Sequence, residues 1–537
     1  MTAPGPRLRE GFPRAFCRQF VYGASRNRTG DHVGDVPRAV LRRSAVVRSV
    51  LRMRALDALR ARLAELADLD GLGRLAEWDQ QTKMPPDGAP ARAHQLAALR
   101  RLAHDRAIDD EIGEWLGELE SGMDTLGELD RDLVRLARRD WERQRRVPSE
   151  LVGELSQAAA EGQAAWLAAR EAADFNAFAP SLRRNVELAR AYAACFDDVK
   201  HPYDALLADY DYGLSTQRVQ AVFAQLAEGL TPLLADLPAR PDLLAELGVP
   251  LDAQKAAVFS TLRRLGVDED SWRVDVSAHP FSEALSQRDT RVTTRYVDNG
   301  VESLIGALHE FGHALYERQI APELERTNLG GGTSMSMHES QSKLWENHVG
   351  RHPAFVGVLA AELAAGGCAI APDVLHAALV QVRPSLIRTS ADEVSYPLHI
   401  VLRFELEHAL IEESLDVAEL PAAWNDGMQR LLGIDVPDDA VGVLQDIHWA
   451  VGSFGYFPSY AIGCIIAAQL WEQLETDLGP QDAALGAAEV SAISSWLGDH
   501  VHRFGRRLDT EPLLERAIGR GLDVEPLLRH LTALANA

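Results

Sequence analysis

Residues 308–315 read LHEFGHAL, a stretch that contains the pattern H-E-x-x-H. On a helix, His309 and His313 lie one turn apart on the same face, so both imidazoles can bind one metal ion. Glu310 lies beside them, where it can accept a proton from a metal-bound water without binding the metal itself. The flanking residues are mostly apolar, and a metal ion relieves the cost of burying these polar groups among them. The stretch therefore predicts a buried helix that carries part of a metal site.

A catalytic zinc site needs a third protein ligand and one open position. The best candidate is Glu339, which follows the consecutive glycines 330–332 and begins a new amphipathic segment. The glycines allow a sharp reversal of the chain that returns Glu339 towards the two histidines. Two histidines and one carboxylate leave the ion a net positive charge and room for a water molecule. The alternative is that the histidines are only packed or solvated and bind no metal.

The composition of the chain excludes several classes of function. The 537 residues carry a formal net charge of -24, and 46% of them are hydrophobic. No stretch approaches twenty apolar residues, which indicates a soluble protein, and the negative charge argues against nucleic acid and anionic membranes as partners. The four cysteines are scattered without a C-x-x-C pair, which indicates a reducing cytoplasm and no thiolate zinc site.

Residues 1–52 differ from the rest of the chain. They hold 11 arginines, no lysine and 3 acidic residues, a net charge of +8, so the remainder carries -32. Arg14 and Arg18 interrupt the apolar residues, which argues against a secretory signal. We expect a poorly ordered, Arg-rich extension ahead of Met53 and a single helical domain over 53–537. An Arg-rich targeting peptide is the alternative for the extension.

From Met53 onward the hydrophobic pattern predicts an all-α protein. Leucines recur at intervals of three and four residues between 56 and 69, and Ala-, Leu-, Arg- and Glu-rich runs continue from about 91 to 237. Residues 272–297 are the exception, because alternation and β-branched residues predict a small hairpin or sheet just before the metal helix. Its edge would either pair with a peptide backbone or simply cover the core.

Six motifs, taken in order, resemble those of the carboxypeptidase Taq family of zinc metallocarboxypeptidases. They are His279-Pro280-Phe281, D-x-R-x-T at 289–293, H-E-x-x-H at 309–313, H-E-S-Q at 338–341, I-R-x-x-A-D at 387–392 and G-x-x-Q-D-x-H-W at 442–449. The resemblance covers roughly residues 53–537 and leaves the first 52 unmatched.

The resemblance implies an all-α fold with a deep substrate groove, a homodimer, and release of single C-terminal residues with broad specificity, proline excepted. It also implies that His309, His313 and Glu339 bind the metal and that Glu310 is the catalytic base. We expect one Zn²⁺ per chain, with Co²⁺ or another divalent ion as alternatives.

An exopeptidase of this kind must also recognise the terminal carboxylate of its substrate, and arginine binds carboxylates bidentately. Arg388 is the first candidate and Arg291 the second, and the alternative for each is a purely structural ion pair with Asp392 or Asp289. The tetrahedral oxyanion needs a hydrogen-bond donor besides zinc, and we expect it from Tyr456 or Tyr460, with His399 or His448 assisting. Additional substrate contacts are expected from His279 and Gln445.

The sequence therefore predicts a cytoplasmic, homodimeric, zinc-dependent metallocarboxypeptidase that acts on peptides through Glu-assisted attack of a metal-bound water. A zinc oligopeptidase that cuts inside short peptides is the alternative, because it shares the helix-borne site but needs no carboxylate anchor. A metal-free helical binding scaffold is the third hypothesis, and elemental analysis for zinc separates it from the other two.

Overall fold

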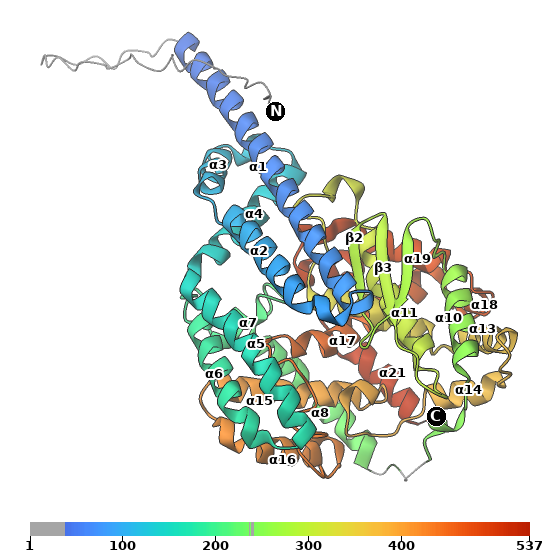
Figure 1. Cartoon of the computed structure of the whole chain (residues 1–537). Coiled ribbons are helices and arrows are strands. Elements are labelled where there is room, and N and C mark those ends of the chain that lie inside the picture. The colour runs from blue at the N-terminus through green and yellow to red at the C-terminus, as the bar shows by residue number, and fades with distance from the viewer. Residues whose placement is uncertain (1–37, 236, 238–240, 537) are drawn as a thin grey trace, which may run out of the picture. The chain divides into compact units, whose positions relative to one another are not determined.

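A computed structural model describes residues 38–235, 237 and 241–536 (Figure 1). The chain divides into two compact units, residues 1–51 and residues 52–537. Helix α1, Arg38–Thr82, contains the boundary between the two units. Residues 1–37, the larger part of the expected Arg-rich extension, lie outside the described residues, so the order and the role of that extension stay predictions.

The second unit is mainly helical, which confirms the predicted all-α class. Its first half contains α2 (Ala89–Ala107), α3 (Asp110–Glu120), α4 (Glu128–Arg146), α5 (Ser149–Ala172), α6 (Phe175–Ala193), α7 (Pro202–Leu207), α8 (Thr216–Ala235), α9 (Leu243–Glu246) and α10 (Leu251–Arg264). The helices after the sheet are α11 (Glu302–Arg318), α12 (Met335–Lys343), α13 (Pro353–Ala365), α14 (Pro372–Leu379), α15 (Tyr396–Ile411), α16 (Leu420–Leu432), α17 (Phe457–Leu478), α18 (Asp482–Gly486), α19 (Ser491–His500), α20 (Thr510–Ile518) and α21 (Glu525–Ala535). None of the described helices is long and apolar enough to cross a membrane.

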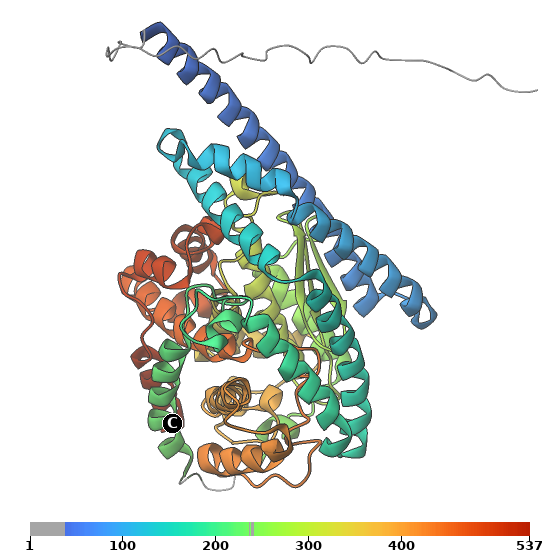
Figure 2. The same ribbon diagram turned by 90° about the vertical axis from the view of Figure 1, so that its left-hand side faces the viewer.

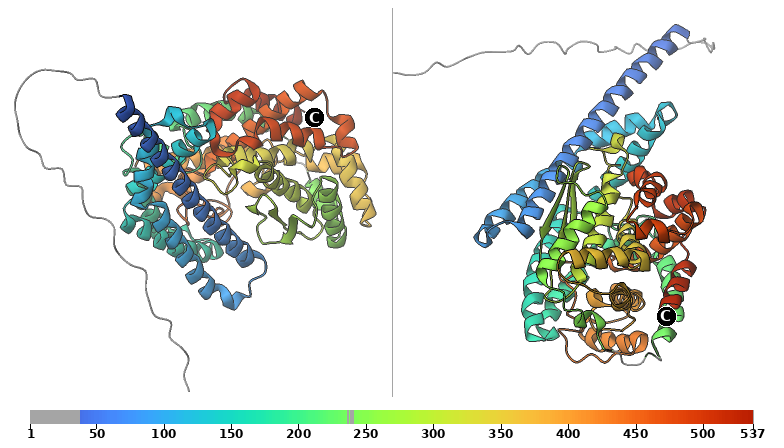
Figure 3. Two further views of the ribbon diagram at one scale, coloured as in Figure 1. Left: turned by 90° about the horizontal axis from the view of Figure 1, so that it is seen from above. Right: turned by 90° about the vertical axis from the view of Figure 1, so that its right-hand side faces the viewer.

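A three-stranded sheet precedes α11, as the sequence predicts. Its strands are β1 (Trp272–Val276), β2 (Ser282–Ser286) and β3 (Asp289–Thr294), in the spatial order β1-β3-β2. Strands β2 and β3 form the predicted antiparallel hairpin, and β1 adds a parallel partner on the other side of β3. Strand β2 is therefore an edge strand. The sheet runs alongside the yellow-green helix α11 in Figures 2 and 3.

Helix α11 packs against the sheet, α12 and a π-helical turn, Leu344–Val349, that follows α12 directly. Phe311, next to the metal-site residues, lies between two tryptophans: its ring centroid is 5.7 Å from that of Trp272 and 4.8 Å from that of Trp345. All three side chains are buried. The aromatic contacts fix the rotation of α11, and with it the face that carries the histidines.

Two glycines allow the helices of the site to approach closely. A Cβ atom at Gly312 of α11 would lie 2.4 Å from the carbonyl oxygen of Gln341 in α12. A Cβ atom at Gly463 of α17 would lie 2.6 Å from Cγ of Glu339. Real Cβ atoms do not approach so closely, so the two glycines are required for α12 to lie between α11 and α17. This packing places Glu339 against α11.

We expect Gly463→Ala to displace Glu339 and to lower the free energy of unfolding by about 1–3 kcal/mol, as overpacking of a core does. Metal affinity should fall with it, which a chelator competition titration would measure. Gly357→Ala is the matched control, because a Cβ atom at Gly357 of α13 meets no atom within 4 Å. Wild-type metal affinity in Gly463→Ala would show that this contact does not position Glu339.

Candidate metal centre

The three predicted metal ligands meet at one point. His309 and His313 of α11 and Glu339 of α12 each offer a ligand atom, and these atoms lie within 4.8 Å of one another. The Nε2 atoms of His309 and His313 are 3.8 Å and 3.5 Å from Oε2 of Glu339. Glu339 is buried, and the two histidines are partly buried. Two imidazoles and one carboxylate are the donor set of catalytic zinc sites, and the arrangement leaves the cavity side open.

The far side of the His309 ring is held by an anchored carboxylate. Its Nδ1 is 2.8 Å from Oε2 of Glu346, which lies in the π-helical turn. Lys343 Nζ (2.8 Å) and Arg351 Nη1 (3.1 Å) donate to the two oxygens of Glu346. An ionised carboxylate only accepts hydrogen bonds, so Nδ1 carries the proton of His309 and Nε2 keeps its lone pair for a metal.

The far side of the His313 ring meets another imidazole. Nδ1 of His313 is 2.7 Å from Nδ1 of His338, and Nε2 of His338 is 2.9 Å from Oε1 of Glu317. The backbone N–H of Gly332 donates to the same carboxylate oxygen over 2.9 Å. Each of the two histidines therefore has a hydrogen-bond partner behind it, which is how histidines that bind metals are usually oriented.

Burial and neighbouring charges shift the pKa values at this site. Burial, with a smaller contribution from Glu339, raises the pKa of Glu310 to about 7, although His309 opposes the shift. Burial also lowers the pKa of His313 to about 4. Burial alone would raise the pKa of Glu339, but the two histidines hold it below its ordinary value. His313 and Glu339 thus favour a neutral imidazole and an ionised carboxylate, the forms that bind a metal ion.

The metal site lies in the wall of a cavity of about 1080 Å³. Besides the three ligands, Glu310, Tyr456 and Tyr460 line it, together with residues 280–284 at the start of the edge strand β2. A second cavity of about 560 Å³ shares lining residues with the first, among them Arg74 and Ala284, and follows β2 further. The predicted groove is present, and it extends along the sheet edge.

A sequence model of the carboxypeptidase Taq (M32) metallopeptidase family matches residues 58–534. The chain belongs to this family. It is a metallocarboxypeptidase, and membership of the family implies a divalent metal ion. The match covers the described metal site and nearly all of the second unit.

Two curated relatives are similar over most of their length. Thermostable carboxypeptidase 1 of Thermus thermophilus is 38% identical over 487 residues, which cover 87% of this chain and 95% of that protein. Carboxypeptidase 1 of Bacillus subtilis is 36% identical over 454 residues, which cover 83% of this chain and 91% of that protein.

Solved structures agree with this assignment. The M32 carboxypeptidase from Deinococcus radiodurans R1 superposes with a TM-score of 0.85 at 35% identity, covering 90% of this chain and 100% of that one. Metallocarboxypeptidase 1 of Trypanosoma cruzi gives a TM-score of 0.86 at 31% identity, with the same shares of the two chains covered.

The side chains expected to stabilise the oxyanion of this metallocarboxypeptidase lie in two layers. Tyr456 and Tyr460 reach the cavity. His448 lies behind them, with its Nε2 3.1 Å from the hydroxyl oxygen of Tyr460. His399 is fully buried, and its Nε2 is 3.1 Å from the carbonyl oxygen of Ser385. His399 is not among the residues that line the described cavity.

Arg388 is buried behind Tyr460, with its guanidinium carbon 4.9 Å from the centroid of the tyrosine ring. Its Nε and Nη2 donate to Oδ1 of Asp446 over 3.1 Å and 2.8 Å. The carboxylate considered as its structural partner, Asp392, instead accepts the backbone N–H groups of residues 394 and 395. Arg403 also donates to Asp446, over 2.6 Å, so that two buried cations share one carboxylate.

The other predicted substrate residues lie away from the lining of the described cavity. Arg291 forms the anticipated ion pair with Asp289, with two contacts of 2.8 Å, and lies over the ring of Trp78. Gln445 accepts the backbone N–H of Arg388 over 2.9 Å and so joins two of the sequence motifs. His279 is exposed.

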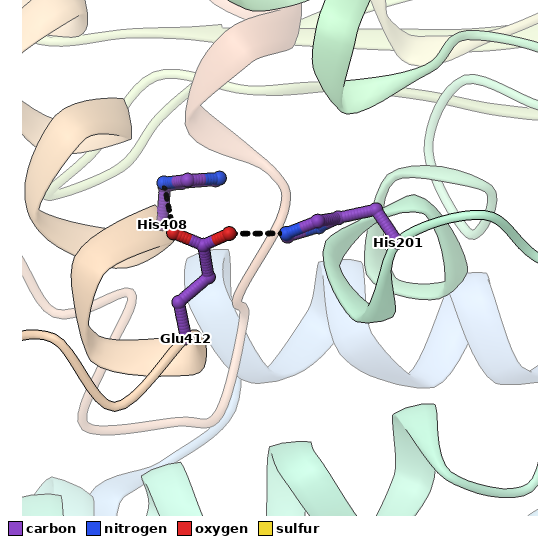
Figure 4. Close-up of side chains that lie close together, drawn as sticks. All are labelled: His201, His408 and Glu412. Atoms are coloured by element: carbon purple, nitrogen blue, oxygen red, sulfur yellow. Dashed lines mark hydrogen bonds and ion pairs between the residues drawn. The ribbon is translucent and has the colours of Figure 1, made fainter.

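A second cluster of possible metal ligands has the wrong protonation pattern. Nδ1 of His201 accepts the backbone N–H of Tyr203 over 3.1 Å and caps α7. Its single proton must then be on Nε2, which donates to Glu412 over 2.6 Å, as Figure 4 shows. His408 lies 3.2 Å from the other oxygen of Glu412. Because Nε2 of His201 has no lone pair to offer, this cluster is a hydrogen-bonded helix cap.

Sequence reasoning missed the residues behind the two histidines. Glu317 lies one turn after His313 on α11, His338 directly precedes Glu339, and Glu346 lies two turns after Glu339. Helical spacing places each of them on or near the metal face, which is the signal that would have found them. Their partners, however, depend on how α11 and α12 pack.

Replacement of Glu339 by alanine should weaken metal binding more than about 100-fold, because loss of a ligand exceeds the 10–100-fold effect of losing a supporting residue. Metal content after gel filtration and a chelator titration would measure this. Glu362→Ala is a matched control, since Glu362 is equally buried but pairs with Arg264. Full metal content in Glu339→Ala would mean that another residue is the third ligand.

Proposed function

We propose that this metallocarboxypeptidase releases single C-terminal residues from peptides and uses one Zn²⁺ per chain, bound by His309, His313 and Glu339. The observation that carries the proposal is the convergence of both Nε2 atoms on one carboxylate oxygen in the wall of a large cavity. When bound, the ion would supply Lewis acidity and a water molecule of lowered pKa.

Glu310 acts as the general base and then as the general acid. Its carboxylate lines the cavity next to His309 and makes no hydrogen bond to any residue that the structure describes. It is therefore free to take a proton from the attacking water. The same carboxyl group then returns that proton to the amine that leaves.

Tyr456 and Tyr460 stabilise the oxyanion that develops on the scissile carbonyl. Both line the cavity, and their rings contact each other edge to face with centroids 5.0 Å apart. His448 supports Tyr460 from behind through its Nε2. His399, one layer deeper, is bonded instead to the carbonyl oxygen of Ser385, so of the two histidines His448 is the better candidate to assist.

Arg388 binds the terminal carboxylate of the substrate. Asp446 holds its Nε and Nη2, but its Nη1 has no hydrogen-bond partner among the described residues. A carboxylate that reaches past Tyr460 would use this remaining edge of the guanidinium. Arg291 ranks second for two reasons. Its Nε and Nη2 are also bonded to a carboxylate, that of Asp289, and Arg291 is not among the residues that line the described cavity.

The resemblance further supports broad specificity with proline disfavoured and a homodimer, and the scattered cysteines support a cytoplasmic location. A zinc oligopeptidase that cuts inside short peptides remains the alternative. The relatives named carboxypeptidases favour the exopeptidase. Cleavage of a C-terminally amidated peptide at a rate equal to that of the free acid would favour the oligopeptidase.

Glu310→Gln should retain the metal and lose about 10²–10⁴-fold in kcat, because the amide has a similar shape but cannot accept the proton. Metal analysis of the purified variant and steady-state assays on a tripeptide would test this. Loss of the metal in this variant would instead identify Glu310 as a ligand.

Arg388→Ala should lower kcat/KM on free-acid peptides. The loss should correspond to about 2–4 kcal/mol of transition-state stabilisation, the usual cost of removing one partner of a buried, charged hydrogen bond. Arg388→Lys should recover only part of this loss, because an ammonium group lacks the planar fork. Cleavage of the matching peptide amide should change far less.

Equal losses on the acid and the amide would show that Arg388 supports the fold or the transition state rather than the carboxylate. Parallel measurements on Arg291→Ala would then test whether the second candidate binds the carboxylate.

A further inference from the structure

With a neutral His338, the hydrogen bonds behind His313 run in a single direction. The Glu317 carboxylate can only accept, and its Oε1 faces both Nε2 of His338 and the N–H of Gly332, each at 2.9 Å. Nε2 of His338 therefore carries the proton. In a neutral imidazole the other nitrogen is then an acceptor, so Nδ1 of His338 accepts the proton that Nδ1 of His313 donates over 2.7 Å. The chain ends with a free lone pair on Nε2 of His313.

The His338 ring is held in place by its surroundings. Its centroid is 5.2 Å from that of Tyr316, and a Cβ atom at residue 332 would lie 2.6 Å from its Cδ2. Glycine at 332 therefore leaves space for the ring, while its N–H fixes the Glu317 oxygen that the ring contacts. His338 is also the neighbour of Glu339, so the same turn of α12 supplies one ligand and orients another.

The two metal-binding histidines are supported in different ways. His309 meets the carboxylate of Glu346 directly, and two cations brace that carboxylate. His313 reaches its carboxylate, Glu317, only through an intervening imidazole. The orientation of His313 thus depends on a side chain that lines the cavity and is about one-fifth exposed.

We propose that His338 and Glu317 are positioning residues that fix the tautomer and the orientation of His313 for metal binding. The inference rests on the proposed metal centre. It adds that His338 and Glu317 keep the proton of His313 on Nδ1, which leaves the lone pair of Nε2 for the metal. Without an acceptor at His338, the His313 ring loses both its anchor and its preference for the Nδ1 proton.

His338→Phe tests this directly, because phenylalanine fills the ring space but has no acceptor. We expect its affinity for Zn²⁺ to fall about 10–100-fold, the effect of removing a supporting residue. His338→Asn should lose less, since its amide oxygen can replace the Nδ1 acceptor. His104→Gln is the matched control, because His104 lines the same cavity without contacting a ligand.

Two measurements separate positioning from a general structural role. Chelator competition gives the Zn²⁺ affinity, and thermal unfolding of the metal-free and Zn²⁺-loaded forms gives the stabilisation by the ion. We expect the metal-free His338→Phe protein to unfold near the wild-type temperature and to gain less from Zn²⁺. Unchanged affinity, or equal destabilisation of both forms, would overturn the inference.

A Zn²⁺ titration of the wild-type protein separates failure of the proposed metal centre from failure of the positioning role. If the wild-type protein bound no stoichiometric Zn²⁺, the proposed metal centre would fail, and the inference with it. If wild-type binding were normal and His338→Phe matched it, only the role of His338 and Glu317 would be wrong.

Discussion

Helix α11 is buried over nearly its whole length, yet four of its ionisable side chains line the cavity, and the arrangement of the surrounding elements depends on this. A buried polar group is costly unless it finds a partner. His309, His313 and Glu317 each have one, supplied by α12 or the π-helical turn. Glu310 alone among the four faces the cavity without a protein partner. The one unsatisfied group is thus the one proposed to exchange protons with substrate.

The elements around α11 are themselves joined by buried charges. Asp211 accepts hydrogen bonds from the backbone of Ser336 in α12 (3.2 Å), from Ser459 in α17 (2.9 Å) and from Thr510 in α20 (3.2 Å). It therefore fixes α12, which carries Glu339, relative to α17, which carries Tyr460. Asp446 likewise accepts hydrogen bonds from both Arg388 and Arg403, and so joins the segments that carry these two arginines.

The sequence is sufficient for those parts of the site that depend on local geometry. The helix around His309 and His313 and the hairpin before it follow from the periodicity of the sequence. Glu339 was found because it is a carboxylate that follows the glycine turn at 330–332, where the chain can return to the histidines. Hydrogen-bond partners that come from distant segments of the chain could not be predicted from the sequence. Asp446 lies far along the chain from Arg388, and no local pattern selects it over the nearby Asp392.

The parallel pairing of β1 with β3 was not predictable for the same reason, since it depends on how the hairpin docks. The cavity position of Tyr460 and the buried position of His399 also depend on packing between helices. Spacing along the chain shows which residues can share a face. It does not show which of these faces is covered.

The three candidate metal ligands lie close together in the chain, whereas the residues that line the cavity do not, so the two sets differ in the chain entropy that their assembly costs. His309, His313 and Glu339 fall within a single segment, 309–339, but the tyrosines near 456–460 come from more than a hundred residues further on. Closing the longer loop costs about 1.2 kcal/mol more chain entropy, at about 0.6 kcal/mol for each doubling of length. Bringing Glu339 to the two histidines therefore costs less chain entropy than bringing the tyrosines to them. Helix α17, which carries Tyr460, also packs against Glu339, so the three candidate ligands reach their final positions only when this distant helix docks.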